Sequence, residues 1–164
     1  MLYIFGGLPG AGKTTLARRL AADLKAVYLR IDTIEHAITA YGLPITGPEG
    51  YTVAYRVAAD NLLNGLDVVA DSVNPLAITR QSWRSAATES GAPFREIEVI
   101  CSDPAEHRRR VETRPADIDG LRLPMWDEVV NREYHPWDTA PIVVDTAGKT
   151  PEESVAELVA AIRG

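Results

Sequence analysis

The segment Gly7-Leu8-Pro9-Gly10-Ala11-Gly12-Lys13-Thr14 has the residue types and spacing best suited to chemistry in this sequence. It matches the pattern G-x-x-x-x-G-K-[ST], follows the apolar run 2–5 and precedes a stretch with helical periodicity. Its glycines let successive backbone N–H groups face one anion, and the positive end of the following helix adds to that field. The segment therefore predicts a binding loop for the phosphates of a nucleoside triphosphate.

Each residue of this loop has an expected role. Lys13 can reach the β- and γ-phosphates, and the Thr14 hydroxyl can bind Mg²⁺. A loop after the last predicted strand, which begins with Asp145 and Thr146, is placed to close around the base of the nucleotide. The predicted nucleotide-binding residues are Gly7, Pro9, Gly10, Ala11, Gly12, Lys13, Thr14, Thr15, Asp145 and Thr146.

Polar residues follow two other predicted strands. Asp32 comes directly after the second strand, where a carboxylate can accept the proton of an attacking hydroxyl. Arg30, two residues earlier, should share its face and can orient Asp32 or contact substrate. Asp71 ends the third strand and can hold Mg²⁺ through water or bind the acceptor, and Asn74 can bind the acceptor. The alternatives are a helix cap for Asp32, a solvated charge for Arg30, a turn residue for Asp71 and the start of a helix for Asn74.

The segment 103–137 is rich in arginine and is interrupted by Pro115, Gly120 and Pro124. A helix, an irregular stretch and a second short helix are typical of a mobile lid, here at about 113–126. Arg110 and Arg114 are four residues apart and should share one helical face. Cationic lid residues stabilise the charge on a transferring phosphoryl group. The alternative is a solvated basic helix.

These residues need a scaffold of alternating strands and helices. Apolar runs predict strands at about 2–6, 27–31, 67–71, 94–101 and 142–145. Helical periodicity and caps predict helices at about 13–24, 32–41, 49–66, 75–90, 104–113, 125–134 and 151–162. This alternation predicts a single α/β domain, a doubly wound five-stranded parallel sheet that binds ligands at the carboxyl ends of its strands.

The composition of the chain argues against some kinds of partner, namely nucleic acid, a disulfide partner and a membrane. The chain has 164 residues and a net charge of −6, which disfavours general nucleic-acid binding. Its one cysteine, Cys101, lies in an apolar run and is interpreted as a core thiol without a disulfide partner. No basic leader and no run of about 20 apolar residues is present, so we expect a cytoplasmic protein without a membrane span.

Taken together, the loop, Arg30-x-Asp32, Asp71-x-x-Asn74, the arginine lid and Asp145-Thr146 resemble the small P-loop kinases. That group includes the kinase domain of polynucleotide kinase, chloramphenicol phosphotransferase and zeta toxins. The resemblance implies a P-loop NTPase sheet with strand order 2-3-1-4-5, as in adenylate kinase. It also implies that Asp32 is the general base, that Lys13 and Thr14 hold phosphate and Mg²⁺, and that Arg110 and Arg114 are lid arginines.

The expected function is therefore transfer of the γ-phosphate of ATP to a hydroxyl group of a small molecule. One departure from the pattern of the group argues against a polynucleotide substrate. Glu35 and His36 stand where polynucleotide kinases tend to carry an arginine. The alternatives are a polynucleotide or nucleotide 5′-hydroxyl kinase and a non-catalytic regulator that binds ATP. A toxin that phosphorylates a nucleotide sugar is a further one.

Overall fold

The computed structural model describes residues 1–163, which form five strands and seven helices in alternation. The strands are β1 (Leu2–Gly6), β2 (Val27–Arg30), β3 (Val68–Asp71), β4 (Phe94–Ile100) and β5 (Ile142–Asp145). The helices are α1 (Lys13–Leu24), α2 (Ile31–Ala40), α3 (Glu49–Leu63), α4 (Ala77–Glu89), α5 (Pro104–Thr113), α6 (Trp126–Val130) and α7 (Pro151–Arg163). In this described part of the chain, no helix is long and apolar enough to cross a membrane.

The strands form one parallel sheet in the order β2-β3-β1-β4-β5, so the predicted architecture and strand order are confirmed. β1 lies at the centre, with Leu2 opposite Val68 of β3 and Phe94 of β4. Neighbouring strands are far apart in sequence, because each parallel connection crosses over through a helix. The carboxyl ends of β1, β2 and β3 therefore come together at one edge.

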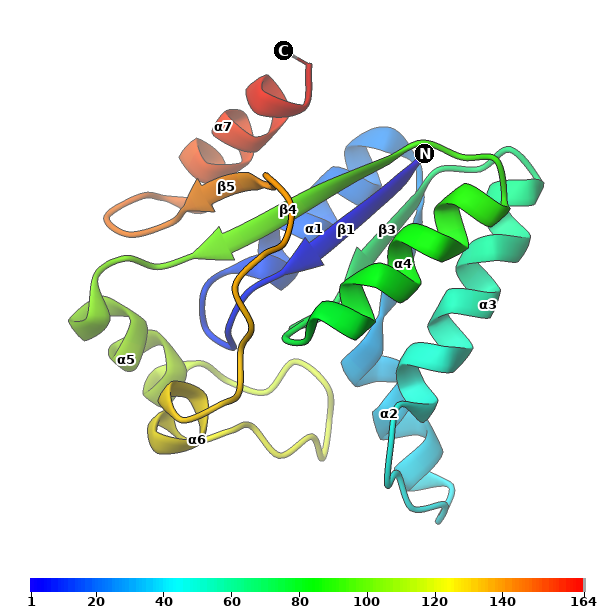
Figure 1. Cartoon of the computed structure of the whole chain (residues 1–164). Helices are drawn as coiled ribbons and strands as arrows, with labels where there is room; N and C mark the ends of the chain where they lie inside the picture. The colour runs from blue at the N-terminus through cyan, green and yellow to red at the C-terminus, as the bar shows by residue number, and fades with distance from the viewer. Residues whose placement is uncertain (164) are drawn as a thin grey trace.

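Apolar side chains alternate between the two faces of the sheet and build two cores. Tyr3 and Phe5 point to the core shared with α1 and α7, whereas Leu2 and Ile4 point to the core shared with α3 and α4. Figure 1 shows these two helical layers on opposite sides of the sheet. Both layers are needed because a parallel sheet is buried on both faces.

Several element boundaries differ from the prediction, including the end of α3 at Leu63 and the start of α4 at Ala77, and two of the differences lie near the carboxyl edge of the sheet. β2 ends at Arg30 because α2 begins at once with Ile31, so Asp32 lies in the first turn of that helix and is not its cap. A carboxylate there still interacts favourably with the helix dipole. α6 stops at Val130, short of the predicted residue 134, and the chain continues without regular structure to β5.

The segment between α5 and α6, residues 114–125, forms a loop at the carboxyl edge of the sheet, where the lid was predicted (Figure 1). The chain returns to β5 through residues 133–139, which we call the strap. Trp137 of the strap packs so closely on Gly6 that a Cβ there would lie 2.7 Å from the indole ring. The lid segment thus connects α5 to α6, and the strap, which follows α6, packs on the end of β1.

Candidate active site

A cleft of about 950 Å³ opens at the carboxyl edge of the sheet. It is bounded by the phosphate-binding loop, the ends of β2 and β3, α5, the lid segment and the loop before α7. Ligands of doubly wound sheets bind at this edge, outside the carboxyl ends of the strands. The cleft is therefore the candidate active site.

The backbone of the phosphate-binding loop requires its glycines. Gly7 has φ of +135°, and a Cβ there would overlap the carbonyl oxygen of Val99. Gly12, at φ of +102°, is the N-cap of α1 and directs the start of that helix at the loop. Only glycine adopts such conformations readily. The residues of this loop region that line the cleft are Pro9, Gly10, Gly12, Lys13, Thr14 and Thr15.

Lys13 is buried under the loop and has no carboxylate partner within ion-pair distance among residues 1–163. Its Nζ donates a hydrogen bond to the carbonyl oxygen of Leu8 at 3.0 Å. Burial lowers the pKa of Lys13 from 10.5 to about 8, against the opposing effect of Asp71 and Asp32. A ligand phosphate would supply the missing counter-charge.

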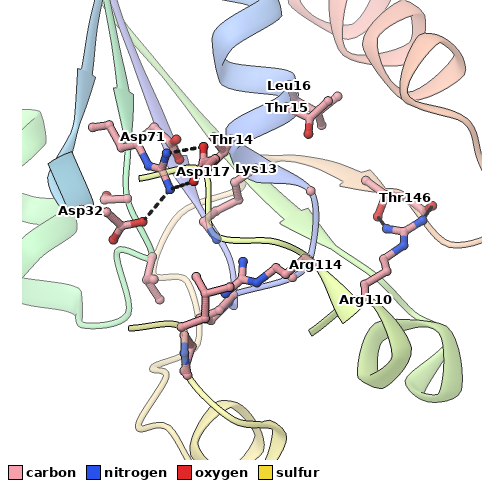
Figure 2. Close-up of a pocket in the computed structure, with 18 of the residues that line it drawn as sticks. Lys13, Thr14, Thr15, Leu16, Asp32, Asp71, Arg110, Arg114, Asp117 and Thr146 are labelled. Carbon is pink, nitrogen blue, oxygen red and sulfur yellow. Dashed lines mark hydrogen bonds and ion pairs between the residues drawn. The ribbon is translucent and has the colours of Figure 1, made fainter. Parts of the chain in front are cut away.

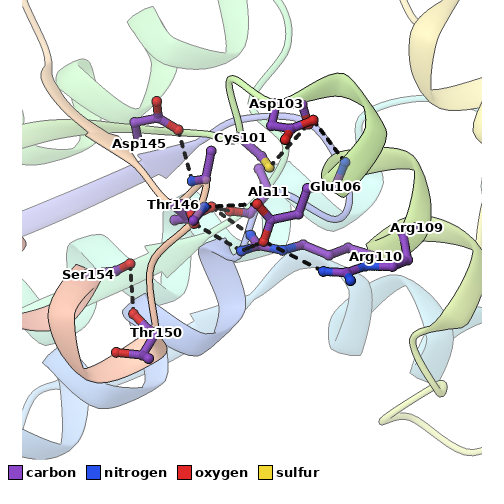
Figure 3. Close-up of polar contacts among 12 residues, drawn as sticks. Ala11, Cys101, Asp103, Glu106, Arg109, Arg110, Asp145, Thr146, Thr150 and Ser154 are labelled. Carbon is purple, nitrogen blue, oxygen red and sulfur yellow. Dashed lines mark hydrogen bonds and ion pairs between the residues drawn. The ribbon is translucent and has the colours of Figure 1, made fainter.

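The loop after β5 is held tightly against the nucleotide side of the cleft (Figure 3). The Thr146 hydroxyl lies 2.8 Å from the carbonyl oxygen of Ala11 and lines the cleft. Asp145 instead accepts hydrogen bonds from the backbone N–H groups of Ser102 and Ala147, both at 3.0 Å, and does not line the cleft. Asp145 and Thr146 were both predicted to lie near the base of the nucleotide, but only Thr146 lines the cleft.

The two predicted lid arginines both line the cleft, but their side chains extend in different directions. α5 ends at Thr113, and the backbone N–H of its C-cap residue Arg114 still donates to the carbonyl oxygen of Arg110 at 3.1 Å. The Arg110 guanidinium donates to the Thr146 hydroxyl at 2.7 Å, to its carbonyl oxygen at 2.9 Å and to Glu106 at 2.7 Å. The Arg114 side chain instead extends toward Lys13 (Figure 2) and is close enough to Asp32 and Lys13 for their charges to interact.

Asp32 and Arg30 meet at the other side of the cleft, as predicted. An Arg30 Nη2 lies 3.2 Å from the Asp32 carboxylate. The same guanidinium binds both carboxylate oxygens of Asp117, at 2.6 and 3.0 Å. Burial opposes the charge on Arg30, yet the hydrogen bond to Asp117 and the nearby Asp32 raise its pKa overall. Figure 2 shows Asp32 and Asp117 on the same side of the cleft as Lys13 and Asp71.

Asp71 and Asn74, the two predicted acceptor ligands, have different positions. Asp71 lines the cleft and accepts a hydrogen bond from the Tyr28 hydroxyl at 2.6 Å, which helps to hold its carboxylate in place. Asn74 is fully buried outside the cleft lining, in a left-handed conformation with φ of +52°. Asn74 shapes the turn after β3, since asparagine tolerates that conformation.

Several charged residues that line the cleft were not predicted as site residues, among them Asp117, Arg132 and Glu35. Arg132 follows α6, lines the cleft and is close enough to lower the pKa of Lys13. Glu35 lies one turn after Asp32, and burial and the Asp32 charge raise its pKa. Their sequence signal was weak, because charged residues in loops and on amphipathic helices are usually solvated.

The histidines and the cysteine have no nucleophilic or metal-binding arrangement in residues 1–163. His107 connects α5 to the phosphate-binding loop, with its Nε2 2.8 Å from the carbonyl oxygen of Pro9. Cys101 is half-buried just after β4, not in the core proper, and burial raises the pKa of its thiol. A raised thiol pKa disfavours the reactive thiolate.

Comparison with known proteins identifies the family. Residues 2–125 match a family described as an AAA domain, and they include the phosphate-binding loop, Asp32 and Asp71. The chain belongs to this AAA domain family. A relative from Aeropyrum pernix, a probable adenylyl-sulfate kinase, is 29% identical over 96% of this chain and 89% of its own.

Solved structures share the fold of this AAA domain. The Mycobacterium tuberculosis APS kinase CysC, in complex with AMPPNP and APS, has a TM-score of 0.73 at 19% identity, over 99% of this chain and 97% of its own. A gluconokinase from Sinorhizobium meliloti has a TM-score of 0.69 at 15% identity, over 98% and 90%. The predicted resemblance to small P-loop kinases is thereby confirmed.

Proposed function

We propose that this AAA domain is an ATP-dependent kinase that transfers the γ-phosphate to a hydroxyl group of a small molecule. The related proteins support this class of reaction, because adenylyl-sulfate kinase and gluconokinase are both kinases of small molecules. The acceptor would enter between α2 and the lid segment, and ATP would lie on the phosphate-binding loop. Such a reaction needs the ATP pool of the cytoplasm, which is the compartment that we propose.

The observation that carries the proposal is a set of unpaired cations opposite a carboxylate. Within residues 1–163, Lys13, Arg114 and Arg132 are the cleft cations without an ion pair, whereas the cleft's other arginines and Lys149 pair with carboxylates. The electrostatic effects of all three reach the same region around Lys13. Fixed cations of this kind stabilise the negative charge on a transferring phosphoryl group.

Asp32 is the proposed general base. It lies at the start of α2, is close enough to Lys13 and Arg114 to affect their pKa values, and is oriented by Arg30. A carboxylate in this position can accept the proton of the attacking hydroxyl as the new P–O bond forms. The electron pair of the broken bond stays on the departing ADP, whose charge Lys13 offsets.

The site also fits a magnesium ion held mainly by phosphate oxygens. No cluster of three or more histidine, cysteine or acidic side chains lies among the residues described. Mg²⁺ in kinases is typically bound by one or two protein groups together with phosphate and water. We assign those groups to the Thr14 hydroxyl and the Asp71 carboxylate. The ion would neutralise charge on the β- and γ-phosphates.

Two of the alternatives would require a different cleft. A polynucleotide 5′-hydroxyl kinase must hold acceptor phosphates, but α2 presents Asp32 and the half-buried Glu35 to the acceptor side. Two carboxylates there repel a phosphate backbone. A non-catalytic regulator would need neither a base nor unpaired cations aligned with it.

The test is phosphate transfer from labelled ATP to a panel of sugars, sugar acids, nucleosides, adenylyl sulfate and a 5′-hydroxyl oligonucleotide. We expect transfer to a small molecule, and a fall of about 10²- to 10⁴-fold in kcat for Asp32→Asn, the range typical of a general base. ATP binding by this variant, measured by calorimetry, should be retained.

The matched control is Asp23→Asn, which removes an exposed carboxylate on α1 that pairs only with Arg19. It should leave transfer unchanged. Undiminished transfer by Asp32→Asn would show that Asp32 is not the base. Transfer to the oligonucleotide alone would favour the polynucleotide alternative, and ATP binding without transfer to any compound would favour the regulator.

A further inference from the structure

Asp117 connects the lid segment to the end of β2 and to α1. Both of its carboxylate oxygens bind the Arg30 guanidinium, and one lies 2.8 Å from Arg18 of α1. Among the side chains of residues 114–125, Asp117 alone forms an ion pair or hydrogen bond with the sheet or with α1, within the part of the chain described. One carboxylate thus holds the lid segment over the cleft.

The partner of Asp117 is unusual for a surface ion pair. The Arg30 side chain is only 6% exposed, whereas that of Asp117 is 38% exposed. Two parallel hydrogen bonds between guanidinium and carboxylate fix the plane of the guanidinium as well as its position. The hydrogen bond to Arg30 also lowers the pKa of Asp117, which keeps the carboxylate charged.

The same guanidinium reaches Asp32. Its Nη2 is shared between Asp117 at 3.0 Å and Asp32 at 3.2 Å. Its Nε is buried without a hydrogen-bond partner in the described structure, so the other contacts alone set the orientation of the group. The position of Arg30 beside Asp32 therefore depends on the lid carboxylate.

We propose that Asp117 is a positioning residue, which orients Asp32 through Arg30 only when the lid segment lies over the cleft. This inference rests on the proposed kinase function, in which Asp32 is the base. Its consequence is that the base is aligned only after water has been excluded, so that transfer to the acceptor prevails over hydrolysis of ATP. Arg18 strengthens the contact from α1 without touching Asp32.

The test compares Asp117→Asn and Asp117→Glu with the wild-type enzyme. For Asp117→Asn we expect kcat for transfer to fall by about 10- to 100-fold, the cost of a misplaced reacting group. The KM for ATP should stay nearly constant, and the ratio of hydrolysis to transfer should rise. Asp117→Glu keeps the charge and should restore part of kcat.

The matched control is Asp119→Asn, which removes an exposed lid carboxylate without an ion pair in residues 1–163. It should behave as wild type in every assay. Equal kinetic effects of Asp117→Asn and Asp119→Asn would overturn the proposal, because they would indicate a general effect of lid charge. So would a rise in the KM for ATP at unchanged kcat.

Limited trypsin digestion supplies a readout that does not depend on activity. Arg122 is an exposed cleavage site within the lid segment. We expect faster cleavage after Arg122 in Asp117→Asn than in wild type or Asp119→Asn, because the lid loses its attachment. If no acceptor is ever phosphorylated but cleavage accelerates, the kinase function fails while the lid contact stands. Unchanged cleavage together with unchanged kcat would refute the contact itself.

Discussion

At the scale of single residues, burial of Lys13 sets the pH range in which its ammonium group carries a positive charge. The residue has no acidic partner within ion-pair distance among residues 1–163, and its burial lowers the pKa to about 8. Below that pH the ammonium carries its charge, and above it the free enzyme increasingly holds a neutral amine. ATP binding restores the charge, because the phosphates stabilise the protonated form.

We therefore expect the affinity for AMPPNP to be constant up to about pH 8 and to fall by at most tenfold for each further unit, as one titrating proton requires. Calorimetric titration at a series of pH values would measure this. Lys13→Arg and Lys13→Met serve as controls, because neither side chain titrates in that range. The same pH dependence in Lys13→Met would assign the effect to another group.

At the scale of elements, α4 connects the strap to the sheet. Arg84 of α4 donates to Glu96 of β4 at 2.9 Å and to both carboxylate oxygens of Asp138 in the strap. Arg80, one turn earlier and fully buried, donates to the carbonyl oxygen of His135 at 2.9 Å and lies 4.6 Å from the centre of the Trp137 ring. These contacts hold the strap against α4 and the edge of the sheet.

Removal of Arg84 should destabilise the fold because it leaves Glu96, whose side chain is 5% exposed, without a cation. For Arg84→Met we expect a loss of about 2–3 kcal/mol in the free energy of unfolding, somewhat below the range for a fully buried pair. Urea denaturation would measure it. The matched control, Arg108→Met, breaks an exposed pair with Glu112 and should change stability little. Similar losses in both variants would contradict this role of Arg84.

At the scale of the whole molecule, the cleft combines segments from almost the full chain. Lys13 begins α1, Arg114 follows α5, and Arg132 follows α6. These three cations line one cleft because α5, the lid segment and α6 bring the chain back to the phosphate-binding loop. The charge at the reaction centre is therefore a property of the tertiary fold.

We expect Arg114→Met and Arg132→Met each to lower kcat by about 100-fold, the cost of removing one fixed electrostatic contact to the transition state. The KM for ATP should change much less, because the phosphate-binding loop holds the nucleotide. Steady-state kinetics would separate the two parameters. Arg95→Met, at the opposite end of β4 and exposed, is the control. A rise in the KM for ATP at unchanged kcat would show that the residue binds ATP in the ground state and does not stabilise the transition state.

Much of the fold was predictable because its signals are local. Alternating apolar runs and helical periodicity gave nearly all the element boundaries, and α1 and α5 have the predicted bounds. The errors lie at the ends of elements: β2 ends one residue early because α2 begins directly, and α3 and α6 end before the predicted residues 66 and 134. α5 ends as predicted, because Pro115 disfavours helical backbone in the preceding residue.

The sequence by itself determined the phosphate-binding loop, since glycines at fixed spacing and the adjoining helix set its backbone conformation locally. It also determined that Asp32 lies near Arg30, because only one residue separates the two along the chain. Only the tertiary structure decided which cations remain unpaired, that Arg110 is held by Thr146, and that Asp117 meets Arg30. Those contacts join residues up to 87 positions apart, and their energies depend on burial, which no short segment of sequence specifies.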